Sequence, residues 1–205
     1  MKSYHIIIVL IMLIISGCGN EVSTSTKDES ATITMAYLDG TWTRECELTD
    51  KSSTSAKVAI NFSGSSDNAT KTTTFYTGTI CYNTNYILRE KINNITIGSK
   101  TATAANLIIT KYTAVTLDIT IEPKSTALAT SLNDASFCGL TSWSSGSETS
   151  IAGKTCSSTT YSSVNDGFRD LVQMNSERTY IRTGNTSELG SDGYPSTVYY
   201  NKYFK

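Results

Sequence analysis

The chain has 205 residues, with 17 basic and 18 acidic side chains and a formal net charge of −1. This balance argues against a nucleic-acid partner, because proteins that bind nucleic acids usually carry a strongly basic face. The length suits one domain with a substantial hydrophobic core. Abundant threonine and 12 tyrosines favour β structure.

An apolar run from Ile6 to Ile15 follows the positive charge of Lys2. It is shorter than the roughly 20 residues that a helix needs to cross a bilayer, and it is typical of the hydrophobic region of a secretory signal. Residues 15–18, Ile-Ser-Gly-Cys, resemble the lipobox of bacterial lipoproteins. The resemblance implies cleavage before Cys18 and a lipid on that cysteine. An ordinary signal peptide with a chance cysteine is the alternative.

The lipobox resemblance sets the expected organisation of the chain. Residues 1–17 are predicted to be the signal peptide, 18–36 the lipidated cysteine and a flexible polar tether, and 37–205 the folded domain. Several acyl chains would make the membrane attachment stable, because each buried CH2 contributes about 0.8 kcal/mol. Gly19 replaces the aspartate that often signals retention at the inner membrane in such lipoproteins. We therefore expect an exported protein that is lipid-anchored to the cell envelope, at the outer membrane.

Beyond residue 37, short stretches of alternating polar and apolar residues are separated by polar turns. This pattern predicts eight or nine antiparallel strands. Ten alternating stretches, some of only three or four residues, supply these strands: 40–48, 57–62, 72–82, 86–92, 95–97, 107–110, 114–121, 168–174, 179–183 and 197–204.

The period changes over residues 125–135, where apolar residues recur at helical spacing and Ser125 is a suitable N-cap. We expect one short helix there, covering an edge or an end of the sheet. The serine- and threonine-rich stretch 141–161, which contains Trp143, is expected to be a long loop.

Five cysteines are present, and Cys18 is assigned to the lipid. An even remainder in an exported chain indicates two disulfides, for which three pairings exist. We expect the sequential pairing, Cys46–Cys81 and Cys138–Cys156. A zinc site built from these four cysteines is the alternative, although no Cys-x-x-Cys pair occurs. No metal or other cofactor is expected.

Gly40-Thr41-Trp42, at the start of the first predicted strand, resembles the Gly-x-Trp motif of lipocalins and their calycin relatives. The resemblance implies an all-β fold, an antiparallel eight- to nine-stranded lipocalin-like barrel. It also implies that Trp42 packs across the closed end beneath an arginine, either Arg182 or, as second choice, Arg178. The chain lacks the second lipocalin signature, Thr-Asp-Tyr, and its helix falls mid-chain. A β-sandwich is the alternative.

Further short stretches resemble bacterial lipoproteins with lipocalin-like domains. They are Cys46, Phe137-Cys138-Gly139 with Trp143, residues 151–156, residues 168–180 and Gly193-Tyr194-Pro195.

Groups that commonly support catalysis are scarce. The single histidine, His5, lies in the predicted signal peptide, which removes the usual general base for serine or cysteine nucleophiles. No Ser-x-x-Lys, Gly-x-Ser-x-Gly or glycine-rich phosphate-binding motif occurs. Two carboxylate pairs remain, Asp166 with Asp170 and Glu45 with Glu47. We expect the first pair to lie in a solvated loop and the second on an outer strand face, so a non-catalytic protein is predicted.

Barrels of about eight strands are either filled by side chains or hold one small ligand. We expect a binding module that takes a small apolar ligand in the barrel or at its rim. The alternative is an envelope protein with a structural or macromolecule-binding role, a filled barrel and exposed aromatic side chains between Tyr194 and Phe204. In that segment, alternation places Tyr199 and Tyr203 on one face and Tyr200 on the other.

Overall fold

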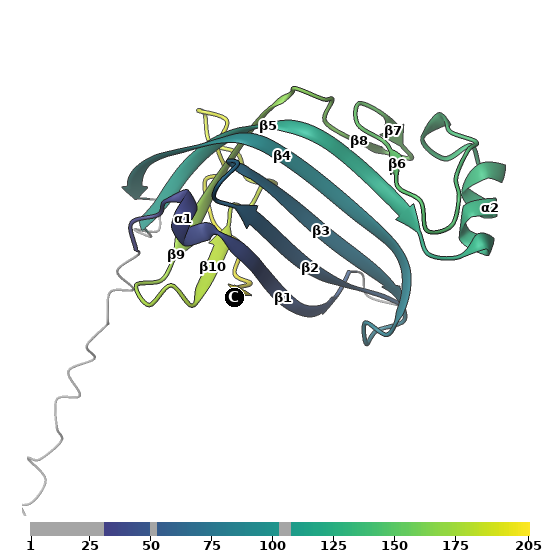
Figure 1. Ribbon diagram of the computed structural model, residues 1–205, viewed down its shortest axis with the longest axis horizontal. Helices are drawn as coiled ribbons and strands as arrows, with labels where there is room; N and C mark the ends of the chain where they lie inside the picture. Colours follow the sequence, from purple (N-terminus) through teal and green to yellow (C-terminus); the bar gives the residue numbers. More distant parts are fainter. Residues whose placement is uncertain (1–30, 50–52, 103–107) are drawn as a thin grey trace, which may run out of the picture.

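Eight antiparallel strands close into a barrel, each hydrogen-bonded to the barrel strands before and after it along the chain (Figure 1). The computed structural model describes residues 31–49, 53–102 and 108–205. The barrel strands are β1 (Gly40–Leu48), β2 (Thr54–Ser63), β3 (Asn68–Thr77), β4 (Asn83–Ala102), β5 (Ile108–Pro123), β9 (Gly167–Met174), β10 (Tyr180–Thr183) and β11 (Tyr203–Phe204). Pairing of β1 with β11 completes the ring. The predicted barrel is confirmed, and the sandwich alternative is wrong.

Two strand predictions differ from the structure in extent. The break expected at Asn93-Asn94 is a bulge inside β4: Asn94 has a φ of 53°, and the register with β5 shifts between Asn93 and Thr96. Of the last predicted strand, only Tyr203–Phe204 forms a strand, and Val198 makes an isolated bridge to Gly184. Residues 184–202 form a loop whose backbone groups bond largely to one another, as between the Ser196 amide and the Glu188 carbonyl.

The inner face of the barrel follows the alternation of the strands. In β2, Ala56, Val58, Ile60 and Phe62 are buried while the residues between them are more exposed. Pairing of β1 with β2 sets Trp42 opposite Ile60. This register places the largest core side chain at the end of the barrel where β1 begins.

A short helix, α1 (Met35–Leu38), covers that end. Leu38 is fully buried, and its carbonyl accepts a hydrogen bond of 2.6 Å from the Trp42 indole. Ile33 is also buried, and the Ala31 amide donates to the Met174 carbonyl. Residues 31–36, which the sequence assigned to the tether, therefore pack against the barrel.

An insertion between β5 and β9 builds a second, smaller core. It contains α2 (Thr126–Asp134), the 3-10 turn η1 (Phe137–Gly139) and the two-residue strands β6 (Thr149–Ser150), β7 (Thr155–Cys156) and β8 (Thr159–Thr160). The predicted helix is confirmed, and the Ser125 side chain accepts from the Leu128 amide as its N-cap. Trp143 is buried in this core, and α1 and α2 lie at opposite ends of the molecule in Figure 1. None of the helices in the described ranges is long and apolar enough to cross a membrane.

Both predicted disulfides are confirmed. Cys46 is bonded to Cys81 and Cys138 to Cys156. The zinc alternative is wrong, because these four sulfurs are bonded to one another. The first bridge ties the distal end of β1 to the β3–β4 turn, and the second closes the insertion on itself.

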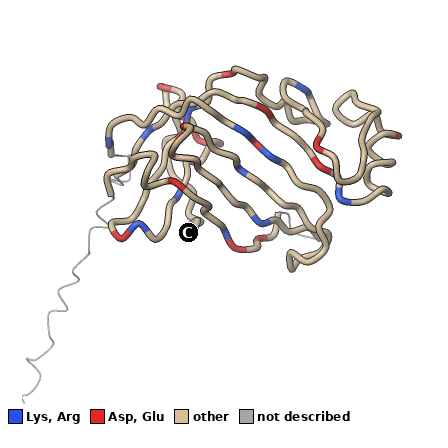
Figure 2. Tube along the Cα trace, viewed as in Figure 1, with Lys and Arg blue, Asp and Glu red and all other residues tan. Residues whose placement is uncertain are grey.

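Acidic and basic positions are intermingled along the chain trace (Figure 2). Three consecutive charged residues, Arg89, Glu90 and Lys91, lie in the middle of β4. Since successive strand residues face opposite sides, Glu90 faces the lumen while Arg89 and Lys91 face outward. The charges of β4 therefore belong to two separate networks.

Candidate functional site

A cavity of about 650 Å³ lies inside the barrel. It extends from Phe62 and Ala69, paired near the α1 end, to Leu48, Thr49 and Tyr199 at the other end. Leu48 is 58% exposed and Tyr199 39% exposed. The cavity is therefore a pocket with its floor near α1 and its rim at the Cys46–Cys81 end.

One wall of the cavity is apolar. It is formed by the inward side chains of β2, with contributions from β3, β4 and β9: Ala56, Val58, Ile60, Phe62, Phe75, Ile92 and Phe168. A second, smaller cavity of about 170 Å³ lies beyond Phe75, between α2 and the inner face of β4 and β5. The main cavity thus has the size and the apolar lining typical of small-molecule sites.

Two ion pairs project into the same cavity. Lys71 on β3 lies opposite Glu90 on β4, with 2.7 Å between the ammonium and the carboxylate. Arg44 on β1 is 3.1 Å from Glu47, and its guanidinium lies over the Tyr203 ring. The Lys71 and Glu90 side chains face the lumen but are 44% and 34% exposed. Solvent therefore reaches this ion pair through the cavity.

The Lys71–Glu90 pair is electrostatically stable. Burial alone would lower the pKa of Lys71, but the charge and hydrogen bond of Glu90, with smaller contributions from Tyr203 and Asp170, outweigh it and raise that pKa. Lys71 therefore stays protonated at neutral pH, with its charge balanced by Glu90.

Asp170, on β9, is the third carboxylate that lines the cavity, and it is only 6% exposed. One carboxylate oxygen, Oδ1, accepts from the Leu171 and Gly184 amides at 2.7 and 3.0 Å. The other, Oδ2, accepts from the Tyr112 hydroxyl at 3.2 Å. Burial raises the pKa of Asp170 to about 6, against the opposing effects of these hydrogen bonds and, more weakly, of the Lys71 charge. The pKa of Tyr112, fully buried beside this carboxylate, is also raised.

The structure corrects the sequence expectation for the two carboxylate pairs. Asp170 lies inside the barrel, not in a solvated loop, whereas Asp166 lies in the preceding turn and accepts from the Ser163 amide. Glu47 also lines the cavity, because a bulge between Arg44 and Glu47 moves it to the inner face, while Glu45 stays exposed. Neither predicted pair converges on one point.

The lumen groups that sequence reasoning missed are Arg44, Lys71, Glu90 and Tyr112. A usable signal was present for Lys71, which shares its strand face with Ala69 and Thr73, both buried. Once the strand was predicted, a charged residue at an inward position would have indicated a polar lumen.

The structure places Trp42 at the closed end with no exposed surface. The cation over its ring is Lys205, at 5.3 Å, and not Arg182. Arg182 follows the inward-facing Ile181 in β10 and therefore lies on the outer face of the barrel. There its guanidinium donates to the Gln173 side chain and lies over the Tyr180 ring. Arg178, the second choice, lies over Tyr37.

The rim of the cavity carries exposed apolar side chains beside the first disulfide. Ile80 and Tyr82, on either side of Cys81, are 77% and 79% exposed. Ser55 holds this turn, because its hydroxyl donates to the Gly78 carbonyl and accepts from the Cys81 amide. Across the opening, Tyr199 and Tyr203 both line the cavity whereas Tyr200 is exposed, which is the division that the alternation predicted.

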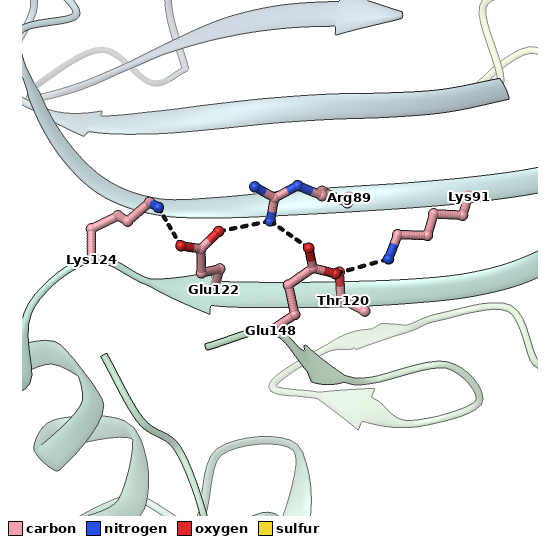
Figure 3. Close-up of polar contacts among 6 residues, drawn as sticks. All are labelled: Arg89, Lys91, Thr120, Glu122, Lys124 and Glu148. Atoms are coloured by element: carbon pink, nitrogen blue, oxygen red, sulfur yellow. Dashed lines mark hydrogen bonds and ion pairs between the residues drawn. The ribbon is translucent and has the colours of Figure 1, made fainter. Parts of the chain in front are cut away.

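On the outer face of β4 and β5, an ion-pair network attaches the insertion to the barrel (Figure 3). The Arg89 guanidinium lies 2.8 Å from Glu122 and 3.2 Å from Glu148, and Lys91 is 2.8 Å from Glu148. Lys124 pairs with Glu122. Hydrogen bonds from Lys124 and Lys91, respectively, lower the pKa of Glu122 and of Glu148 more than burial raises them.

Replacing Glu122 with glutamine is expected to lower the free energy of unfolding by about 1–3 kcal/mol, because it leaves Arg89 without its most buried partner. Glu148→Gln is expected to cost less than about 1 kcal/mol, since that carboxylate is more exposed. Both pKa values lie below the ordinary 4.5 in the folded state, so both contributions exist above about pH 4.5 and are lost as the pH falls. Urea unfolding at pH 7 and pH 4 checks this, and equal costs for the two variants would contradict it.

Cys18, the predicted lipidation site, lies outside the described residues. No protein-family model matches the chain, and no curated protein matches it.

Proposed function

We propose that this protein is a non-catalytic, lipid-anchored lipoprotein of the cell envelope, and that its calycin-like barrel binds one small, largely apolar molecule. The observation that carries the proposal is the cavity of about 650 Å³ with an apolar wall and a rim at one end. A cavity of this size exceeds what is needed to hold water and falls within the range of small-molecule sites.

The polar lumen groups refine the expected ligand. The sequence led us to expect an apolar ligand, but Lys71, Glu90 and Asp170 share the cavity with the apolar side chains. A molecule with a hydrocarbon body and one polar end fits this lining best, because apolar and charged side chains both reach the cavity.

Filling the cavity tests the proposal. Val58→Trp puts a large ring into the lumen from the middle of β2 and is expected to weaken binding of an apolar fluorescent probe at least about tenfold. Lys57→Trp, one residue earlier on the exposed outer face, is the matched control and should leave the affinity within about twofold. Probe titration of the two variants and the wild type measures this. Equal affinity in all three would place the probe outside the lumen and reject the proposal.

The anchor needs its own test. Cys18→Ser is expected to abolish incorporation of a radiolabelled fatty acid, because the thiol that would carry the acyl chains is gone. Metabolic labelling followed by immunoprecipitation measures the change. Cys18→Ser protein that is labelled at the wild-type level would exclude a lipid on this residue. The described chain begins beside α1, at the end of the barrel opposite the rim.

A second candidate function is binding of another macromolecule through the outer surface. Its support is the exposure of Tyr200, at 89%, and of Phe204, at 46%. The tyrosines around them do not form one patch, because Tyr203 faces the lumen and Tyr194 is covered by Lys111 and Arg169. We therefore place this candidate behind ligand binding.

A further inference from the structure

The charges that line the lumen do not balance. The described residues contribute two cations, Arg44 and Lys71, and each already has a carboxylate partner, Glu47 and Glu90 respectively. Asp170 is left over, and no ion pair joins it to a cation among the described residues. The lumen therefore has one carboxylate more than it has cations.

The hydrogen bonds of Asp170 leave one position open. Oδ1 accepts two backbone amides and has both of its usual acceptor positions occupied. Within the part of the chain that the structure describes, Oδ2 accepts only the Tyr112 hydroxyl, which leaves one acceptor position. Since Asp170 lines the cavity, a donor on a bound molecule can complete it.

We propose that the ligand of this cavity is a small amphipathic amine, with its ammonium group paired to Asp170 and its hydrocarbon part against the apolar wall of β2. This inference rests on the proposed ligand-binding function and names its chemical class. A charge-assisted hydrogen bond of this kind is about twice as strong as a neutral one.

An anionic ligand fits the same lining poorly. The Lys71 and Arg44 charges are already neutralised by carboxylates at 2.7 and 3.1 Å. A bound anion would have to displace one of these carboxylates or add to the excess negative charge. The wall formed by Val58, Ile60 and Phe62 would accept the hydrocarbon part of either ligand, so the polar end decides the class.

Three probes that share one hydrocarbon chain test the inference: octylamine, octanol and octanoate, each titrated calorimetrically at pH 7.5. The wild-type domain should bind octylamine at least about tenfold more tightly than octanol, and octanoate most weakly. Asp170→Asn should reduce octylamine affinity to that of octanol and leave octanol binding within about twofold. Asp67→Asn, which removes an exposed carboxylate in the β2–β3 turn, is the matched control and should keep the wild-type order.

The outcomes separate this inference from the proposed function. If no probe binds, the proposed function itself fails. If octanol and octylamine bind equally to the wild type, or octanoate binds most tightly, the cavity binds ligands but the amine assignment is wrong. The wild-type comparison needs no variant, so the inference stays testable if Asp170→Asn fails to fold.

Discussion

Replacing Trp42 with alanine is expected to lower the free energy of unfolding by about 3–5 kcal/mol. Trp42 has no exposed surface and packs in the core cluster with Leu38, Ile60 and Ile181. Removing the ring leaves a cavity at the closed end, beneath α1. It also removes the cation–π contact with Lys205 and the donor to the Leu38 carbonyl. Chemical denaturation at pH 7 measures the loss.

The indole hydrogen bond can be separated from the packing. Trp42→Phe loses the 2.6 Å bond to Leu38, whereas the Trp143 indole has no hydrogen-bond partner among the described residues, so Trp143→Phe loses none. We expect Trp42→Phe to cost about 1 kcal/mol more than Trp143→Phe. Equal costs for Trp42→Phe and Trp143→Phe would mean that the hydrogen bond to Leu38 contributes nothing measurable to stability. A Trp42→Ala variant as stable as the wild type would show that this end of the barrel does not depend on the ring.

How much of this architecture could be predicted depends on the range of the interactions involved. Local signals were sufficient for β1, whose bounds match the prediction, and for α2 with its Ser125 cap. The barrel and both disulfides followed from alternation, cysteine number and the Gly40-Thr41-Trp42 resemblance. Chain alternation also placed Tyr199 and Tyr203 together, although residues 197–202 are not a strand.

The failures occurred where a non-local contact or a bulge decides the outcome. Residues 31–36 look like polar tether, yet the Ala31 amide bonds to Met174, far along the chain. A bulge after Arg44 turned Glu47 inward against the expected alternation. Lys205, at the chain end, lies over Trp42 because β11 pairs with β1, and no local pattern specifies that pairing. Contacts of this kind, made between residues far apart in the chain or created by a bulge, were therefore the least predictable part of the site.

Asp170→Asn is expected to make the unliganded protein more stable at pH 8, by on the order of 3 kcal/mol. Burial raises the pKa of Asp170 from 3.8 to about 6, so the folded state prefers the protonated acid. The stabilising contribution of the protonated group is complete below pH 3.8 and is lost as the pH rises through 6. Asparagine avoids this loss, because its oxygen can accept from the Leu171 and Gly184 amides and its amide group can donate to the Tyr112 hydroxyl.

The advantage of Asp170→Asn should shrink as the pH falls, to about half its size at pH 5 and a few tenths of a kcal/mol at pH 4. Tyr112 lies beside Asp170 on the neighbouring strand, and the other titratable groups that line the cavity with it include Lys71, Glu90, Tyr203 and the Arg44–Glu47 pair. All of them are shared by the two proteins, so the difference between their stabilities isolates Asp170. Urea unfolding of both proteins at pH 8, 5 and 4 measures it. A variant that is less stable than the wild type at every pH would show that the hydrogen bonds of the charged group outweigh its burial.

This pH dependence bears directly on the proposed ligand. An ionised carboxylate without an ion-pair partner inside the barrel lowers the free energy of unfolding at neutral pH. A bound ammonium would restore this free energy by neutralising the charge. Octylamine should therefore raise the melting temperature of the wild type more at pH 8 than at pH 5, where most of Asp170 is protonated. Asp170→Asn should show a small rise that is the same at both pH values. If octylamine stabilises both proteins equally at pH 8, the ammonium does not contact Asp170, and the excess carboxylate of the lumen has no part in recognition.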